Sequence, residues 1–225
     1  MRRLEVGVRN GECGRVDGAV VVAGVDVGST RKGFHCVALR NGVYFEQFAS
    51  GDASAMARWC LRVGARVVGV DAPCRWSLDG RARAAERELM GEKIWCFSTP
   101  TREAAAAHVR GHFGWMLNGE MLFETLRPTH VLFDGVSTAG NLCFETFPQA
   151  VACALAGAVV SAKRKGTVRR ELLRQFGVDC SALSNIDKVD AGLCAVAAHF
   201  VAMGRFKKYG EVETGFIVVP DARAR

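Results

Sequence analysis

The sequence predicts an α/β fold with a mixed sheet, in which three antiparallel strands precede parallel strands and helices flank the sheet. Two runs carry this prediction, because residues 19–26 and 66–71 are rich in valine and each ends on an aspartate. Continuous β-branched runs are typical of parallel strands that are buried on both faces. The third observation is Asn41-Gly42, which lies between two strand-like runs and is typical of the tight turn of an antiparallel hairpin.

Three antiparallel strands open the predicted sheet. The first valine-rich run is followed by a hairpin that joins residues 34–39 to residues 43–48. Residues 53–63 have apolar side chains at helical spacing and are followed by a glycine, so we expect a helix there. This helix carries the chain across to the second valine-rich run, which should therefore lie parallel to the first.

The later elements alternate between helices and strands around an irregular insertion at about residues 79–140. Within the insertion we expect helices at 81–90 and 104–109 and a short strand at 131–134. After it we expect a strand at 142–146, helices at 149–157, 167–176 and 186–203, and a closing strand at 215–220. Because no repeat or linker interrupts the chain, we expect one domain over residues 19–225, preceded by a polar leader or small hairpin at 1–18.

Length and composition favour a folded protein outside the membrane. The chain has 225 residues, of which 49% are apolar, enough for a sizeable core. No apolar run approaches the ~20 residues of a membrane helix, and the first residues lack the apolar region of a signal peptide. The nine cysteines include no Cys-x-x-Cys pair, which favours free thiols in a reducing compartment over zinc binding. We therefore expect a cytoplasmic protein with no membrane partner.

The charge of the chain favours a polyanionic partner such as nucleic acid. The net charge is +7 and the isoelectric point is about 9.1. Basic residues concentrate in two groups, one in the 163–170 region and one in the 81–87 region. Two interpretations stay open for both groups, phosphate binding and a solvated helix face. In the first, the substrate-binding residues are Lys163, Arg164, Lys165, Arg83 and Arg87.

The order of the elements is typical of the ribonuclease H-like fold. In that fold the first strand is central, the fourth lies beside it, and a late helix packs its N-terminal end against both. Asp26 and Asp71 end the two strands here, and the late helix carries Asp187 and Asp190, whose i, i+3 spacing puts both carboxylates on one face. These four aspartates are therefore expected to converge.

Converging carboxylates repel one another unless a hard cation such as Mg²⁺ or Mn²⁺ neutralises them. Two such ions about 3.5–4 Å apart can activate water and stabilise the leaving oxygen of a phosphodiester. We therefore expect Asp26, Asp71, Asp187 and Asp190 to be metal ligands in a two-metal nuclease site, with DNA or RNA as the substrate.

Each acid also has a local structural interpretation. Asp26 lies in a Gly-Val-Asp-Val-Gly turn, Asp71 precedes Ala72-Pro73 and suits an Asx-turn, and Asp187 suits a capping box with Ser184. Asp190 lies beyond the usual capping position, where such an explanation fails. Four acids at the positions that one fold requires favour the shared site over coincidence.

Seven short motifs, in this order along the chain, resemble a known family. They are Gly24-Val25-Asp26, Val70-Asp71-Ala72-Pro73, residues 83–89, residues 97–101, Glu145-Thr146-Phe147-Pro148, residues 161–167, and residues 187–191. The family is the domain-of-unknown-function 429 family, regarded as ribonuclease H-like nucleases. The resemblance implies that Asp26, Asp71, Glu145, Asp187 and Asp190 form the acidic centre, with residues 163–165 beside it. Family members often have an aspartate where this chain has Glu86, and Glu-Val-His-Pro is commoner than its Glu-Thr-Phe-Pro, but neither change removes a carboxylate.

Two other functions compete with the nuclease. Residues 24–30 resemble the first phosphate-binding segment of the sugar kinase, actin and Hsp70 superfamily, and residues 134–140 suit its second phosphate loop. An ATP-binding or ATPase domain ranks second because those enzymes need two ribonuclease H-like lobes, normally well beyond 225 residues. The third is a non-catalytic nucleic-acid-binding adaptor that keeps the fold.

Overall fold

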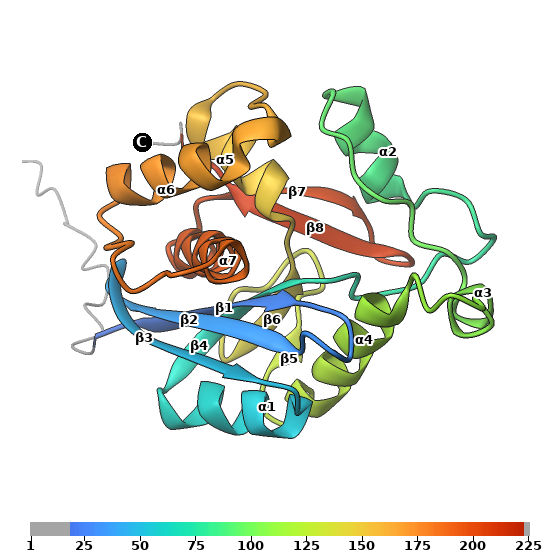
Figure 1. Cartoon of the computed structure of the whole chain (residues 1–225), viewed down its shortest axis with the longest axis horizontal. Helices are drawn as coiled ribbons and strands as arrows, with labels where there is room; N and C mark the ends of the chain where they lie inside the picture. Colours follow the sequence, from blue (N-terminus) through green and yellow to red (C-terminus); the bar gives the residue numbers. More distant parts are fainter. Residues whose placement is uncertain (1–18, 223–225) are drawn as a thin grey trace, which may run out of the picture.

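The computed structural model describes residues 19–222, and the eight strands found in that range form one mixed sheet (Figure 1). The leader or hairpin expected at 1–18 lies outside the described residues. The strands are β1 Val21–Val27, β2 Phe34–Arg40, β3 Val43–Ser50, β4 Ala65–Asp71, β5 Val131–Leu132, β6 Leu142–Glu145, β7 Phe206–Glu211 and β8 Gly215–Pro220. Their order across the sheet is β3-β2-β1-β4-β6-β8-β7, with β5 also paired to β6.

The strand directions confirm the expected mixed sheet. Strands β1, β2 and β3 pair antiparallel, whereas β1, β4, β6 and β8 run parallel to one another. The first strand is central and the fourth lies directly beside it, so the fold is ribonuclease H-like. Because the carboxyl ends of parallel strands meet at one edge, the last residues of β1, β4 and β6 lie along the same edge of the sheet.

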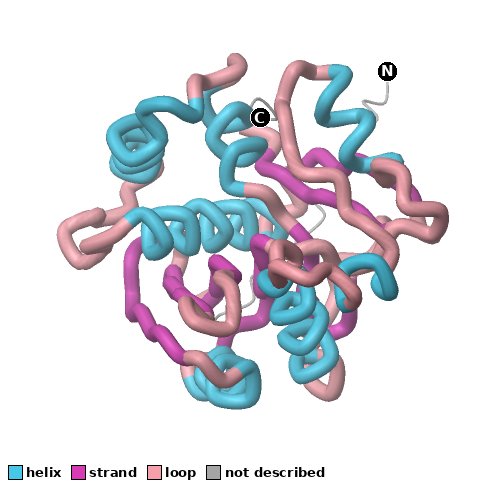
Figure 2. The backbone as a smooth tube through the Cα atoms, turned by 45° about the vertical axis from the view of Figure 1, so that its right-hand side comes forward, coloured by secondary structure: helices cyan, strands magenta, loops and turns pink. Residues whose placement is uncertain are grey.

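Helices cover both faces of the sheet (Figures 1 and 2). Helices α1 (Ala53–Arg62) and α4 (Gly114–Leu126) pack on one face. Helix α7 (Ile186–Ala202) lies against the other face, where α5 (Pro148–Ala156) and α6 (Lys165–Gln175) pack on it from outside. A short 3-10 turn at Ala162–Arg164, η1, precedes α6.

Helix α7 approaches the sheet closely because two strand residues opposite it are glycines. A Cβ atom added to Gly24 in β1 would overlap the backbone of Ala191 and Ala195 in α7. A Cβ atom at Gly69 in β4 would lie 2.7 Å from the carbonyl oxygen of Cys194. The two glycines let the helix backbone rest directly on the two central strands, which fixes where the start of α7 lies relative to the strand ends.

Within the insertion at about residues 79–140, the observed helices differ from the predicted ones. Helix α2 (Ala84–Gly91) and helix α3 (Arg102–Ala106) form near the expected positions. Helix α4 was not predicted, because Gly114 and Gly119 weaken its helical signal. Gly119 is nevertheless required by packing, since a Cβ there would overlap the side chain of Ala72.

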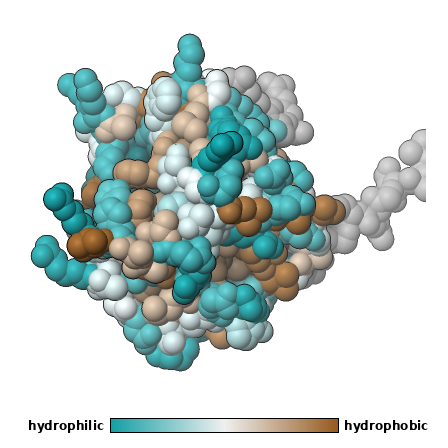
Figure 3. All heavy atoms as spheres, turned by 90° about the vertical axis from the view of Figure 1, so that its right-hand side faces the viewer, coloured by the Kyte–Doolittle hydropathy of each residue, from teal (hydrophilic) through white to brown (hydrophobic). Residues whose placement is uncertain are grey.

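The remaining strands and helices form within a few residues of their predicted bounds, except that strand β7 was not predicted. Strand β7 pairs antiparallel with β8 and packs against α2. Figure 3 shows the side of the molecule that carries α2, α3 and α4, where apolar residues reach the surface between polar ones. Within residues 19–222, none of the helices has the length and apolar character needed to cross a membrane.

Candidate active site

Two aspartates lie next to each other at the carboxyl ends of the central strands. Asp26 in β1 and Asp71 in β4 are direct partners in the parallel register. Side chains alternate between the faces of a strand, so Asp26 shares a face with Gly24, and Asp71 shares one with Gly69. Both aspartates therefore lie on the face that α7 covers.

Helix α7 adds two further acids from its first turns. Asn185 caps the helix, and its side chain accepts a hydrogen bond of 2.8 Å from the backbone N–H of Lys188. The capping box with Ser184 is therefore not the arrangement that starts this helix. Asp187 is half-buried, and Asp190 is only 6% exposed.

The acids of α7 are close enough to the two strand-end aspartates to raise their pKa values. Burial is the largest cause that raises the pKa of Asp26, to about 8, and the charges of Asp190 and Asp187 raise it further against Lys32 and Lys165. The pKa of Asp71 is also raised well above its ordinary value, first by burial and then by Asp26 and Asp190. Burial and the neighbouring acids therefore both favour the protonated forms of Asp26 and Asp71 in the absence of a cation.

Three basic side chains oppose the acids. Arg169 of α6 forms a buried ion pair with Asp190, and it also donates a hydrogen bond of 3.0 Å to Gln149 Oε1. Lys165 Nζ lies 3.8 Å from Asp190 Oδ2, and Lys32 Nζ lies 3.4 Å from Asp187 Oδ1. Arg169 and Lys32 were not predicted as site residues. Arg169 follows Lys165 by four positions on one helix, and that spacing was the available signal.

Within the basic run at 163–165, Lys165 is the residue whose side chain contacts the acidic centre, at Asp190. Lys163 and Arg164 belong to η1 and are exposed, and together with Lys165, Thr167 and Arg174 they line a shallow surface depression. Arg170 also lines it, while its guanidinium donates a hydrogen bond of 2.6 Å to the carbonyl oxygen of Leu183.

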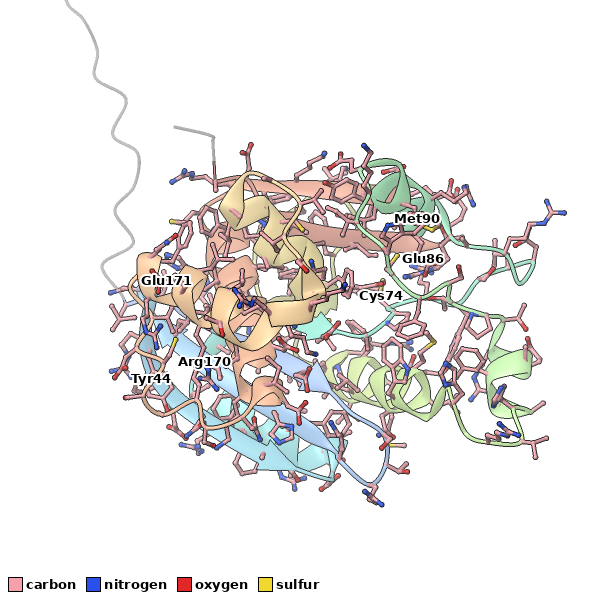
Figure 4. The ribbon with its side chains drawn as sticks, turned by 45° about the horizontal axis from the view of Figure 1, so that its top comes forward. Tyr44, Cys74, Glu86, Met90, Arg170 and Glu171 are labelled. Carbon is pink, nitrogen blue, oxygen red and sulfur yellow. The ribbon has the colours of Figure 1, made fainter. Side chains whose placement is uncertain are left out.

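Glu145 is held in a separate, buried ionic network. Arg83, which is 2% exposed, donates from Nη2 to Glu145 Oε1 at 2.5 Å and from Nε to Glu86 Oε1 at 2.8 Å. The backbone N–H of Cys74 donates to Glu145 Oε2 at 2.9 Å. Figure 4 shows Glu86 on α2 and Cys74 on the loop after β4, the two segments that bring this network together.

The structure thus places the predicted site residues in different settings. Asp26, Asp71, Asp187 and Asp190 come together, and Lys165 joins them. Glu145 lies near enough to raise the pKa of Asp71, although its own carboxylate is occupied by Arg83. Arg87 is exposed on α2, outside the acidic centre, where its guanidinium donates to the carbonyl oxygen of Ala82.

Comparison with known families identifies the chain. A family described as "Protein of unknown function (DUF429)" matches residues 24–214, which is most of the sequence. The chain belongs to the DUF429 family. The match covers the four clustered aspartates and both basic groups, and it confirms the resemblance seen in the seven motifs.

Other comparisons are more distant. Among curated proteins, no match to this DUF429 chain is found. Among solved structures, a Thermus thermophilus RuvC structure is similar, with 17% sequence identity and a TM-score of 0.43. The alignment covers 82% of this chain and 97% of that one. A TM-score of 0.43 is too low to carry the fold assignment. We therefore assign the ribonuclease H-like fold from the strand order and from the position of α7.

The acidic centre of this DUF429 protein suits a hard divalent cation in its chemistry. Within residues 19–222, no three His, Cys, Asp or Glu side chains are already arranged as a metal site. Mg²⁺ is usually bound through one or two carboxylates, with water and substrate phosphates as the other ligands. Burial is the first cause of the raised pKa values of Asp26 and Asp71 and the neighbouring acids are the second, and a bound cation would oppose both effects by favouring the charged carboxylates.

Proposed function

We propose that the protein is a metal-dependent nuclease that hydrolyses phosphodiester bonds in nucleic acid. The observation that carries the proposal is the pair of strand-end carboxylates, Asp26 and Asp71, beneath the acidic start of α7. Basic side chains beside the pair support a polyanionic substrate, because Lys163 and Arg164 are exposed and free to meet phosphates.

In this proposal, Asp26 and Asp71 hold Mg²⁺ or Mn²⁺. A bound divalent ion would activate water for attack and stabilise the leaving oxygen of the phosphodiester. Asp190 offers Oδ2 as a further ligand, since Arg169 binds Oδ1 and Lys165, whose side chain is partly exposed, lies 3.8 Å from Oδ2. Asp187 becomes available when Lys32, which is largely exposed, moves to a substrate phosphate.

Glu145 takes a positioning role. Its bonds to Arg83 and to the backbone of Cys74 fix the loop that follows Asp71. The carboxylate thereby supports the orientation of the acid pair and of any water beside it, while Arg83 neutralises its charge.

The decisive test is the substitution Asp26→Asn, which removes one of the paired charges and keeps the size of the side chain. We expect the wild-type protein to cut at least one member of a panel of single-stranded, duplex, hybrid and branched substrates with Mg²⁺ or Mn²⁺. Asp26→Asn should reduce that rate by about 100-fold or more, because charge stabilisation at the reacting oxygens is lost.

Asp134→Asn is the matched control, because Asp134 caps its own exposed loop by accepting hydrogen bonds from Val136 and Ser137. We expect it to leave cleavage unchanged. ATP hydrolysis is measured beside cleavage. ATP turnover that requires Asp26, with no substrate cut, would establish the ATPase instead, and metal-independent binding without any turnover would establish the adaptor.

A further inference from the structure

A cavity of about 220 Å³ adjoins the acidic centre on the side of the insertion. Asp71 is part of its lining, and so is Val27, which directly follows Asp26. The other walls come from the segment around Phe97 and from the start of α4 at Trp115. Typical ligand pockets measure about 300–1,000 Å³, so this cavity is the size for one small ring system.

Aromatic side chains form the outer wall of the cavity. Phe97 is 64% exposed although it lines the cavity, so its ring borders the opening without being covered. The centroids of the Phe97 and Trp115 rings are 6.4 Å apart, and the ring planes are tilted by 58°. The two rings do not stack face to face on each other, and because Phe97 is largely exposed, part of its ring can stack with a flat group.

The inner wall of the cavity is rigid and polar. Arg83, Glu86 and Glu145 line it, and their ion pairs are buried. Thr99 adds to the network by donating from its hydroxyl to Glu86 Oε1 at 2.5 Å. Arg83 Nη2 donates to Glu145 Oε1, so the charges of this wall are paired inside the protein.

We propose that this cavity, here called the base pocket, receives one unpaired nucleobase of the substrate strand. The base stacks against Phe97 and Trp115, and its own phosphodiester then lies at Asp26 and Asp71. This inference rests on the proposed nuclease function and adds its substrate class, a single-stranded or locally unpaired nucleic acid. A paired base enters such a pocket only after it leaves the duplex stack, at a cost of a few kcal/mol that an unpaired base avoids, whereas stacking on aromatic rings accepts any base.

The test uses the full chain in the presence of a chelator, so that binding is measured without cleavage. The probe is an oligonucleotide with one central 2-aminopurine, used as a single strand and as a perfect duplex. We expect the wild-type protein to bind the single strand about tenfold more tightly than the duplex and to change the 2-aminopurine fluorescence.

Phe97→Ala should weaken single-strand binding by about tenfold, because one stacking surface is lost. The dependence of affinity on salt should stay unchanged, because no phosphate contact is removed. Phe97→Trp should restore the affinity. Trp95→Ala is the matched control, since Trp95 is 74% exposed, two residues from Phe97 and outside the cavity lining, and we expect it to bind like the wild type.

Equal affinity for single strand and duplex, unaffected by Phe97→Ala, would overturn the base pocket. The nuclease proposal would survive that result if Asp26-dependent cleavage persists. A wild-type protein that binds neither probe and cuts no substrate would overturn both.

Discussion

Asp26 and Asp71 lie in an arrangement that is unfavourable for the protein alone. Burial and neighbouring acids raise both pKa values, so the folded chain keeps protons that an exposed carboxyl loses near its ordinary value. For Asp190, the ion pair with Arg169 offsets part of the free-energy cost of burying a charged carboxylate beside other acids. Carboxylates that are unfavourable without a ligand are expected where a cation binds.

This arrangement predicts how stability depends on pH. The pKa of Asp26 rises from its ordinary value of 3.8 to about 8 in the folded protein. The folded state therefore binds this proton more tightly than the unfolded state, and the free energy of unfolding falls as the pH rises through that range. In the absence of metal, Asp26→Asn should melt several °C above the wild type at pH 9 and close to it at pH 4, measured by calorimetry.

Added Mg²⁺ provides the control for that measurement. It should raise the melting temperature of the wild type at pH 8, because ligand binding stabilises the folded state. Mg²⁺ should leave the melting temperature of the Asp26→Asn variant nearly unchanged. Without metal, a difference in melting temperature between the wild type and Asp26→Asn that is the same at pH 4 and pH 9 would show that protonation of Asp26 does not govern stability.

At the scale of secondary-structure elements, the contact between α7 and the two central strands sets the geometry of the site. The helix lies on Gly24 and Gly69, and this contact brings its first turns to the ends of β1 and β4. Asp187 and Asp190 reach the acid pair only because the helix backbone lies this close.

Gly24→Ala tests this contact. The new methyl group would overlap the backbone of α7, so the helix must move away from the sheet. We expect a loss of about 1–3 kcal/mol or more in the free energy of unfolding in urea, as is usual for overpacked cores. Gly91→Ala at the end of α2 is the control, because a Cβ there meets nothing within 4 Å. Equal stability of the two variants would contradict the close packing of α7.

At the scale of the whole molecule, the acids of the site lie within a chain whose net charge is +7. The exposed Lys163 and Arg164 stand beside Lys165, which contacts the acidic centre. A strand bound at the acid pair would therefore continue over this basic surface, where phosphate contacts would release counterions.

The double substitution Lys163→Glu with Arg164→Glu should weaken nucleic-acid binding and flatten its dependence on salt. Two lost phosphate contacts should reduce the slope of log K against log salt by about 1.4 for a single strand. Arg58→Glu with Arg66→Glu is the matched control, since Arg58 lies on α1 and Arg66 at the opposite end of β4 from Asp71. An unchanged slope in the variant with Lys163→Glu and Arg164→Glu would show that these residues form a solvated helix face and do not bind phosphates.

The sequence was sufficient for the features that depend on local patterns. Valine-rich runs with a terminal aspartate predict parallel strands whose acids share an edge, and Asp26 and Asp71 are indeed register partners. The spacing of Asp187 and Asp190 predicts one helix face, because the helical period is independent of the rest of the chain. The hairpin at Asn41-Gly42 is equally local, and both residues have positive φ in the structure.

The tertiary structure alone decided which charges pair and where a cavity remains. Arg83 and Glu145 are 62 positions apart, and Lys32 and Asp187 are 155 apart, so no local pattern links these partners. The base pocket depends on how the insertion packs over the strand ends, and α4, one of its walls, carries a weak helical signal. Periodicity shows which face of an element is buried, but only the packed chain determines what that face meets.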